Sequence, residues 1–267
     1  MARHWISFLF VSSAFLAGCE DSETAAHHDG GHDADTQMDA TMDSGGNNPN
    51  TVQIHGTIVD FANDAPLAAT VCAGSNCATA SASNGAYTLD LPKNSDVTLT
   101  IELTAYKKQV SYLHTDDEDF VYSTQMISNV VFSLNANLIG VDVDATKGSL
   151  NMYAYKLTNG EFPDDNDDVS AGTEGLPGAS YTASPVSGKL AWLNADGLSY
   201  STSGPTSSQG IQVAANADPG SYAVTVSPPE GYDCNTRWMR EGSTAGTLDL
   251  EVVADAMTFF WLRCVEN

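Results

Sequence analysis

The sharpest candidate for metal-binding chemistry in the sequence is an acidic loop centred on residue 166, and the acidic run Asp116–Asp119 is a second. Asp164, Asn166 and Asp168 alternate along this loop, and carboxylate and amide oxygens are the ligands that calcium prefers. An EF-hand loop needs glycine at its sixth position and glutamate at its twelfth. Counting from Asp164, those positions hold Val169 and Gly175, so the loop is not of that type. We interpret it as a solvated acidic loop, with an irregular Ca²⁺ site as the alternative.

Enzymatic chemistry has little support in the sequence. Outside the N-terminal region the histidines are His55 and His114, and they form no closely spaced pair. No GxSxG, HExxH or phosphate-binding glycine loop is present. A metalloenzyme would need His55 and His114 to converge with tyrosines or carboxylates at one metal ion. We therefore expect His55 to be a strand residue, His114 a loop residue, and the protein to be noncatalytic, with no required cofactor.

The tryptophans offer a different kind of site, because aromatic faces stack on sugar rings and fill protein interfaces. Trp238 lies between Arg237 and Arg240 in a segment that we expect to be a loop. It is our candidate ligand-contact aromatic, and the alternative is a cover over the neighbouring Cys234. Trp261 lies in an apolar strand and is expected in the core.

The N-terminus has the parts of a secretory signal in order. Arg3 precedes the apolar run Ile6–Leu16, which is too short to span a bilayer, since spanning takes about 20 residues. The run closes with Leu16-Ala17-Gly18-Cys19, which resembles the lipobox of bacterial lipoproteins. The resemblance implies removal of residues 1–18, a diacylglyceryl group on the Cys19 thiol and a further acyl chain such as palmitate. Glu20, where an aspartate would suggest inner-membrane retention, favours the outer membrane.

The cysteine count fits this assignment, because four cysteines remain once Cys19 is given to the lipid. An even set in an oxidising compartment indicates disulfides. Of the three pairings we favour Cys72–Cys77 and Cys234–Cys264, since each then lies within one predicted domain. A zinc site is disfavoured because the sequence has no CxxC pair.

The distribution of charge distinguishes an N-terminal linker from the folded part of the chain, and the net charge restricts which classes of partner the protein can bind. Residues 19–50 form an acidic segment with no lysine or arginine and few apolar residues, so we expect a disordered linker. The whole chain has 34 acidic and 10 basic residues, which gives a net charge of −24. Such a surface repels phosphate backbones and disfavours nucleic-acid partners.

From Thr51 the sequence changes to short alternating runs separated by turn residues, which indicates β structure. His55–Asp60, Pro66–Val71 and Ser83–Leu89 occur in that order, and Ala105-Tyr106-Lys107 follows. These motifs are similar to the carboxypeptidase regulatory-like domain, a transthyretin-like (prealbumin-like) β-sandwich. The resemblance implies such a sandwich over residues 51–122 and says little about function.

A helical pattern interrupts the strands. Met126, Val130, Leu134 and Leu138 recur every four residues, which predicts one amphipathic helix over Ser123–Ile139, within a connecting segment of residues 123–140. Ser123 would be its N-cap and Gly140 its C′ residue. We expect the apolar stripe to pack on a β domain, with a partner-binding helix as the alternative.

The β pattern returns over residues 141–267, and several of its steps resemble those of the first domain. We therefore expect an all-β protein of two tandem prealbumin-like sandwiches joined by one helix. The functional prediction is a membrane-anchored extracytoplasmic lipoprotein that serves in binding, adhesion or assembly with a surface protein or carbohydrate. A carbohydrate-binding accessory protein is the alternative, and an exposed aromatic row in a shallow groove would favour it.

Overall fold

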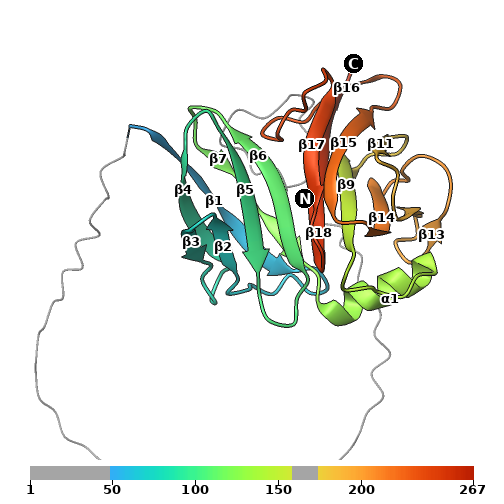
Figure 1. Cartoon of the computed structure of the whole chain (residues 1–267), viewed down its shortest axis with the longest axis horizontal. Helices are drawn as coiled ribbons and strands as arrows, with labels where there is room; N and C mark the ends of the chain where they lie inside the picture. The colour runs from blue at the N-terminus through green and yellow to red at the C-terminus, as the bar shows by residue number, and fades with distance from the viewer. Residues whose placement is uncertain (1–48, 158–173) are drawn as a thin grey trace, which may run out of the picture. The chain divides into compact units, whose positions relative to one another are not determined.

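The computed structural model describes residues 49–157 and 174–267, all within one compact unit that spans residues 48–267. Almost every element in this unit is a β-strand, and Figure 1 shows them arranged as layered sheets. The expected fold class, all-β with tandem sandwiches and one helix, is confirmed.

Eight strands precede the helix and build the first half. They are β1 (Thr51–Asp60), β2 (Thr70–Ala73), β3 (Asn76–Thr79), β4 (Ala86–Pro92), β5 (Ser95–Glu102), β6 (Lys108–Thr115), β7 (Phe120–Val121) and β8 (Thr124–Met126). Strand β1 pairs with β4 on one side and with β7 and β8 on the other. Alternation places Val52, Ile54 and Ile58 of β1 in the core, as its sequence pattern requires.

Helix α1 (Asn129–Ile139) begins six residues later than the pattern predicts. The Ser128 hydroxyl caps it by accepting from Val131 N, and Gly140 ends it in the left-handed conformation at φ 77°. The expected N-cap, Ser123, instead accepts from the backbone N–H of Thr57 on β1, and residues 124–126 pair with β1 as β8. The pairing with β1 therefore takes the first part of the stripe out of the helix.

In the second half, the described residues form ten strands. They are β9 (Gly148–Lys156), β10 (Glu174–Gly175), β11 (Ser180–Ser184), β12 (Lys189–Leu193), β13 (Tyr200–Ser201), β14 (Ile211–Ala217), β15 (Gly220–Ser227), β16 (Tyr232–Asn235), β17 (Thr247–Val252) and β18 (Ala256–Glu266).

A single long sheet runs through both halves, in the order β13-β12-β14-β9-β18-β6-β5-β2-β3. Strand β18, the last of the chain, is the junction: it is parallel to β6 of the first half and to β9 of the second. The two sandwiches are therefore fused through a shared sheet, rather than being linked by the helix alone.

The two smaller sheets cover opposite faces of the long sheet. On β18, Phe260 meets Tyr181 of β11 with ring centroids 5.2 Å apart, whereas the next residue, Trp261, meets Tyr122 beside β7 at 5.6 Å. Consecutive strand residues project to opposite faces. The sheet β4-β1-β7 thus packs on one face and β11-β15-β17 on the other.

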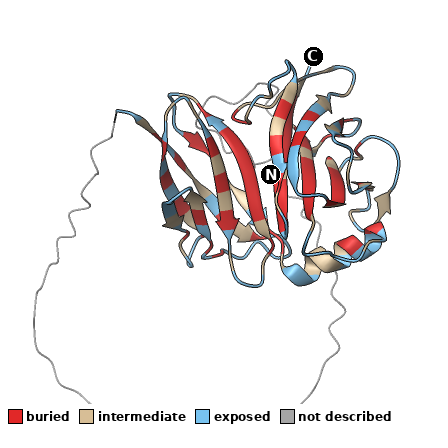
Figure 2. Ribbon diagram, viewed as in Figure 1, coloured by how far each residue is buried: buried red, intermediate tan, exposed pale blue. Residues whose placement is uncertain are grey.

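Helix α1 packs on the second half of the long sheet, on the face that β11-β15-β17 does not cover. Ile139 joins Ala191 of β12 with Val213 and Ala215 of β14 in a small core of its own. Ala214, between the last two, points the other way into the main core. Figure 2 shows buried positions along the central strands of the long sheet, such as β6, β9 and β18, and exposed positions on α1.

Candidate functional site

The two disulfides have the favoured pairing and lie between adjacent strands. Cys72 and Cys77 face each other across the β2–β3 hairpin, and Cys234 of β16 faces Cys264 of β18, each pair with Cα atoms 4.1 Å apart. Ala73 and Asn76 are also paired, next to the turn of this hairpin. Both disulfides crosslink neighbouring strands.

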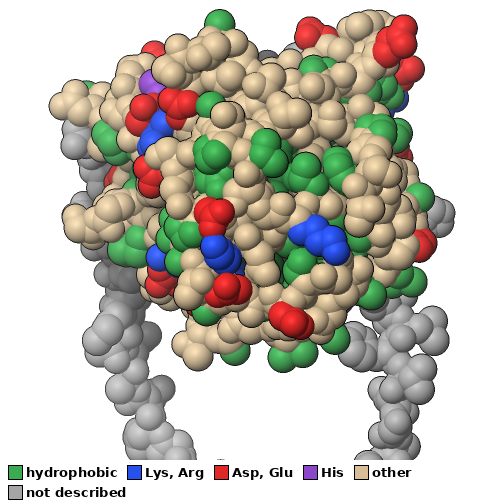
Figure 3. All heavy atoms as spheres, turned by 45° about the vertical axis from the view of Figure 1, so that its right-hand side comes forward, with side chains coloured by type: hydrophobic (Ala, Val, Ile, Leu, Met, Phe, Trp, Pro, Cys, Tyr) green, Lys and Arg blue, Asp and Glu red, His purple; other side chains and the backbone are tan. Residues whose placement is uncertain are grey.

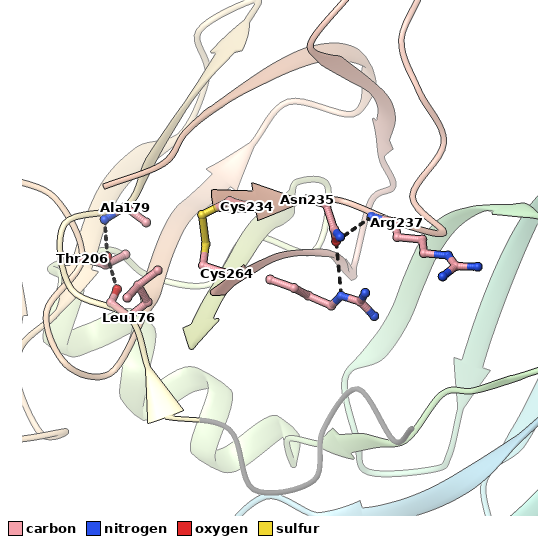
Figure 4. The surroundings of a disulfide bond; sticks show 8 residues. Leu176, Ala179, Thr206, Cys234, Asn235, Arg237 and Cys264 are labelled. Carbon is pink, nitrogen blue, oxygen red and sulfur yellow. Dashed lines mark hydrogen bonds between the residues drawn. A yellow bond between two sulfur atoms is a disulfide. The ribbon is translucent and has the colours of Figure 1, made fainter. Parts of the chain in front are cut away.

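Residues around the second disulfide extend it into a polar network (Figure 4). The Asn235 side-chain oxygen accepts from the backbone N–H of Arg237 and from Nε of Arg263, each at 3.3 Å. Arg263 is completely buried, and its guanidinium lies 4.7 Å from the centre of the Trp238 ring. This arrangement fixes the segment that leads from β16 towards β17.

Trp238 is not a surface aromatic, and its prediction as a ligand contact is wrong. Its residue is 3% exposed, its ring stacks on Phe120 at 5.1 Å, and its backbone has a φ of 63°. Arg237 lies over the same ring at 4.9 Å. Stacking and cation–π contacts make Trp238 a packing residue that ties the second half of the chain to the first.

The two histidines lie in different sheets. His55 is on β1, opposite Thr88 of β4, while Nδ1 of His114 on β6 lies 2.8 Å from a carboxylate oxygen of Asp96. His114 is thus a strand residue rather than the loop residue expected. In the part of the chain that the structure describes, no group of three or more histidine, cysteine or acidic side chains could hold a metal ion.

Other predicted sites lie outside the described residues. These are the lipid-attachment residue Cys19 and the candidate calcium ligands Asp164, Asn166 and Asp168. Among residues 49–157 and 174–267, no helix has the length and apolar character needed to cross a membrane.

A shallow polar groove of about 590 Å³ lies where the β5–β6 turn meets the β17–β18 turn. Its lining residues are Thr70, Glu102, Leu103, Thr104, Tyr106, Lys108, Ala254 and Asp255. Lys108 pairs with Glu102 at 2.6 Å. The Tyr106 hydroxyl donates to Asp60 at 2.7 Å, and this hydrogen bond, followed by burial and the negative charge of Asp60, raises the pKa of Tyr106 to about 12. The groove has hydrogen-bonding groups and one aromatic ring.

Exposed apolar side chains form a second surface, on α1. Val130 is 70% exposed, and Leu134 and Leu138 are each 55% exposed. They are spaced four residues apart and so share one side of the helix, which we term the α1 face. Figure 3 shows hydrophobic side chains reaching the lower margin of the visible surface, the level at which α1 lies in Figure 1. The expectation that the stripe packs on a β domain holds for Met126, which is buried on β8. It is wrong for Val130, Leu134 and Leu138, because the helix buries Ala136 and Ile139 instead.

Side chains hydrogen-bond to the backbone groups at the outer edge of β11. Gln212, completely buried, accepts from Tyr181 N at 2.8 Å and donates to Tyr181 O at 3.1 Å, as a neighbouring strand would. Thr206 bonds to Ala179 N at 2.9 Å and to Leu176 O at 2.7 Å (Figure 4). An added strand would have to displace these bonds, so this edge is protected against strand pairing. Neither Gln212 nor Thr206 belongs to a periodic pattern from which this role could be predicted.

Comparison with known proteins gives only distant similarities. No family model and no curated protein matches the chain. The carboxypeptidase regulatory-like resemblance and the lipoprotein assignment therefore stay predictions.

Three solved structures illustrate the similarity that exists. The minor pilin GBS52 of Streptococcus agalactiae is 8% identical at a TM-score of 0.29, over 81% of this chain and 96% of that one. The shaft pilin SpaA of Lactobacillus rhamnosus GG is 11% identical at 0.23, over 80% and 97%. The Bacillus anthracis TIE protein is 15% identical at 0.24, over 81% of this chain and 34% of that one. This chain thus spans about a third of the TIE structure, and TM-scores this low carry no argument about function.

Proposed function

We propose that this protein is a noncatalytic extracytoplasmic module, held at a bacterial membrane by a lipid on Cys19, that binds or assembles with another protein through the α1 face. The observation that carries the proposal is the exposure of Val130, Leu134 and Leu138 on a helix whose other side is packed. Full burial of such a side chain contributes about 1.5–3 kcal/mol. Covering the exposed part of all three would then contribute about 3–5 kcal/mol.

The disulfides support the extracytoplasmic part of the proposal. Cys72–Cys77 and Cys234–Cys264 both crosslink strands in the folded unit. Disulfides of this kind form and persist outside the reducing cytosol. The acidic surface, at a net charge of −24, keeps a displayed module soluble.

The chemistry of the exposed apolar residues favours a protein partner over a sugar. Among the described residues, the large hydrophobic side chains that are exposed are aliphatic, with Phe61 at 36% as the exception. Trp238 and Trp261 are buried. Sugar sites use exposed aromatic faces, whereas aliphatic ridges pack against the apolar surface of another protein.

Site-directed photo-crosslinking in living bacteria tests this function. A benzophenone amino acid would replace Leu134 in the full chain, and the matched control would carry it at Thr88, an exposed position on β4. We expect protein adducts from position 134. Their yield should be at least ten times the yield from position 88. The adduct partner, once purified, should bind the wild-type chain and lose at least tenfold in affinity for Leu134→Asn/Leu138→Asn. Equal adducts at both positions, or none at 134, would reject the proposal.

A carbohydrate-binding accessory role is the second candidate, supported by the groove around Tyr106. Its ring, the Lys108–Glu102 pair and the carboxylate of Asp255 supply both stacking and hydrogen-bonding groups. Titration calorimetry with soluble oligosaccharides of cellulose, chitin and xylan tests this role. Binding that Tyr106→Ala abolishes and Leu134→Asn leaves unchanged would replace the protein-contact function by this one.

A further inference from the structure

The segment that contains α1 is uncharged in a strongly acidic protein. From Phe120 to Val141 the sequence has no acidic or basic residue, whereas the whole chain has a net charge of −24. Two copies of such a chain repel each other wherever their acidic surfaces approach. The α1 face is a surface at which two copies can meet without bringing like charges together.

The shape of the α1 face suits packing against an identical helix. Val130, Leu134 and Leu138 form one ridge of side chains spaced four residues apart, and such ridges fit into the corresponding grooves of a second helix. Eleven residues give a helix of about 16 Å. A contact of this length would bury less than the roughly 800 Å² per partner of a standard interface, so an association through it would be weak and reversible.

The ends of the helix select the relative direction of the two copies. α1 has no acidic residue in its first turn, whereas at its C-terminal end Lys189 of β12 donates to the Gly140 carbonyl at 3.4 Å, so the N-terminal end is the one without a compensating charge of its own. Asp142 and Asp144, both exposed, follow its C-terminus. In a parallel pair these four carboxylates would face one another. In an antiparallel pair they lie beside the partner's N-terminus, where negative charge is stabilised.

We propose that the occupant of the α1 face is the α1 face of a second copy, packed antiparallel about a two-fold axis near Leu134. This inference rests on the proposed function, because it names the protein that the face binds. A two-fold axis makes the contact isologous. Position 134 then lies opposite itself, and position 130 lies opposite 138.

Cysteine crosslinking of the full chain in bacterial cells tests both the contact and its direction. Single variants Val130→Cys, Leu134→Cys and Leu138→Cys, with Thr88→Cys as control, would be oxidised and examined as dimers on non-reducing gels. Two differently tagged chains, one Val130→Cys and the other Leu138→Cys, would be co-expressed. We expect a dimer from Leu134→Cys and from the mixed 130–138 pair, each at least tenfold above the control, and none from 130–130 or 138–138.

A second substitution separates a specific contact from random collision. Leu138→Asn in the Leu134→Cys background should lower the dimer yield at least tenfold, because every dimer loses two leucines. Dimers from all single variants at equal yield, or 130–130 and 138–138 dimers in place of the mixed pair, would overturn the antiparallel arrangement. If no dimer forms while photo-crosslinking at Leu134 gives a different protein, the second-copy inference fails and the proposed function stands. If neither experiment gives an adduct, both fail.

Discussion

The two disulfides form a matched pair that allows a quantitative prediction about stability. Both join adjacent antiparallel strands with Cα atoms 4.1 Å apart, but their cysteines are 30 residues apart in one case and 5 in the other. In the loop-entropy account, a crosslink stabilises the fold by restricting the unfolded chain, and more so for a longer loop. We therefore predict that the double variant Cys234→Ala/Cys264→Ala is less stable than Cys72→Ala/Cys77→Ala.

The separations set the expected size of the difference. The loop-entropy relation gives about 3.6 kcal/mol for a 30-residue loop and about 2 kcal/mol for a 5-residue loop. The difference of about 1.6 kcal/mol depends only on the ratio of the two loop lengths. Burial acts in the same direction, because Cys264 is completely buried whereas Cys77 is exposed.

Urea unfolding of the two double variants and the wild type measures these losses directly. The midpoints should fall in the order wild type, Cys72/Cys77 variant, Cys234/Cys264 variant. A reversed order, or equal losses from the two variants, would refute the loop-length reasoning. A change in the slope with urea would locate part of the effect in the unfolded state.

Three further predictions concern single features of the fold. Gln212→Leu should lose about 2–4 kcal/mol in urea unfolding, because it leaves two buried backbone groups of β11 without partners, and the exposed control Gln53→Leu should lose less than about 0.5 kcal/mol. Burial raises the pKa of Tyr122 to about 12. The neutral Tyr122 hydroxyl therefore contributes fully to the free energy of unfolding below pH 10, and this contribution is lost as the pH rises towards 12. Phenylalanine does not ionise, so urea midpoints measured between pH 8 and 12 should fall less steeply for Tyr122→Phe than for wild type. Leu134→Asn/Leu138→Asn should lower the free energy of unfolding by about 1–3 kcal/mol, because asparagine has a lower helix propensity and about half of each leucine side chain is already covered; a loss above about 4 kcal/mol would mean that the α1 face belongs to the core.

Local patterns predicted the parts of the fold that depend on local physics. Alternating runs indicated β structure from Thr51 onward and again after residue 141, and the even cysteine set led to the favoured disulfide pairing. Gly140 was correctly placed at the end of α1 because a left-handed residue there needs glycine.

Features that depend on distant partners were not predictable in this way. Ser123 has the chemistry of an N-cap, but its hydroxyl oxygen accepts a hydrogen bond from the backbone N–H of Thr57, which is 66 residues earlier in the chain. The pairing of β18 with both β6 and β9 joins segments more than a hundred residues apart. Trp238 has a polar sequence neighbourhood, and only the approach of Phe120 and Arg263 explains its burial.

The exposure of the α1 face shows the same limit. A stripe of apolar residues at helical spacing predicts a buried side, and the pattern does not say which side the tertiary structure covers. Here the side of α1 that carries Ile139 packs on the sheet, and Leu134 and Leu138 stay exposed to solvent.

Alkylation of a single cysteine tests most directly whether another protein covers the α1 face outside the cytoplasm. Leu134→Cys and the control Thr88→Cys would be labelled with a membrane-impermeant maleimide, in cells with a permeabilised outer envelope and as dilute purified chains. We predict that position 88 labels equally in both settings, and that position 134 labels at least tenfold more slowly in cells. Equal labelling of position 134 in both settings would contradict the covered face, and no labelling of position 88 in cells would contradict the extracytoplasmic location.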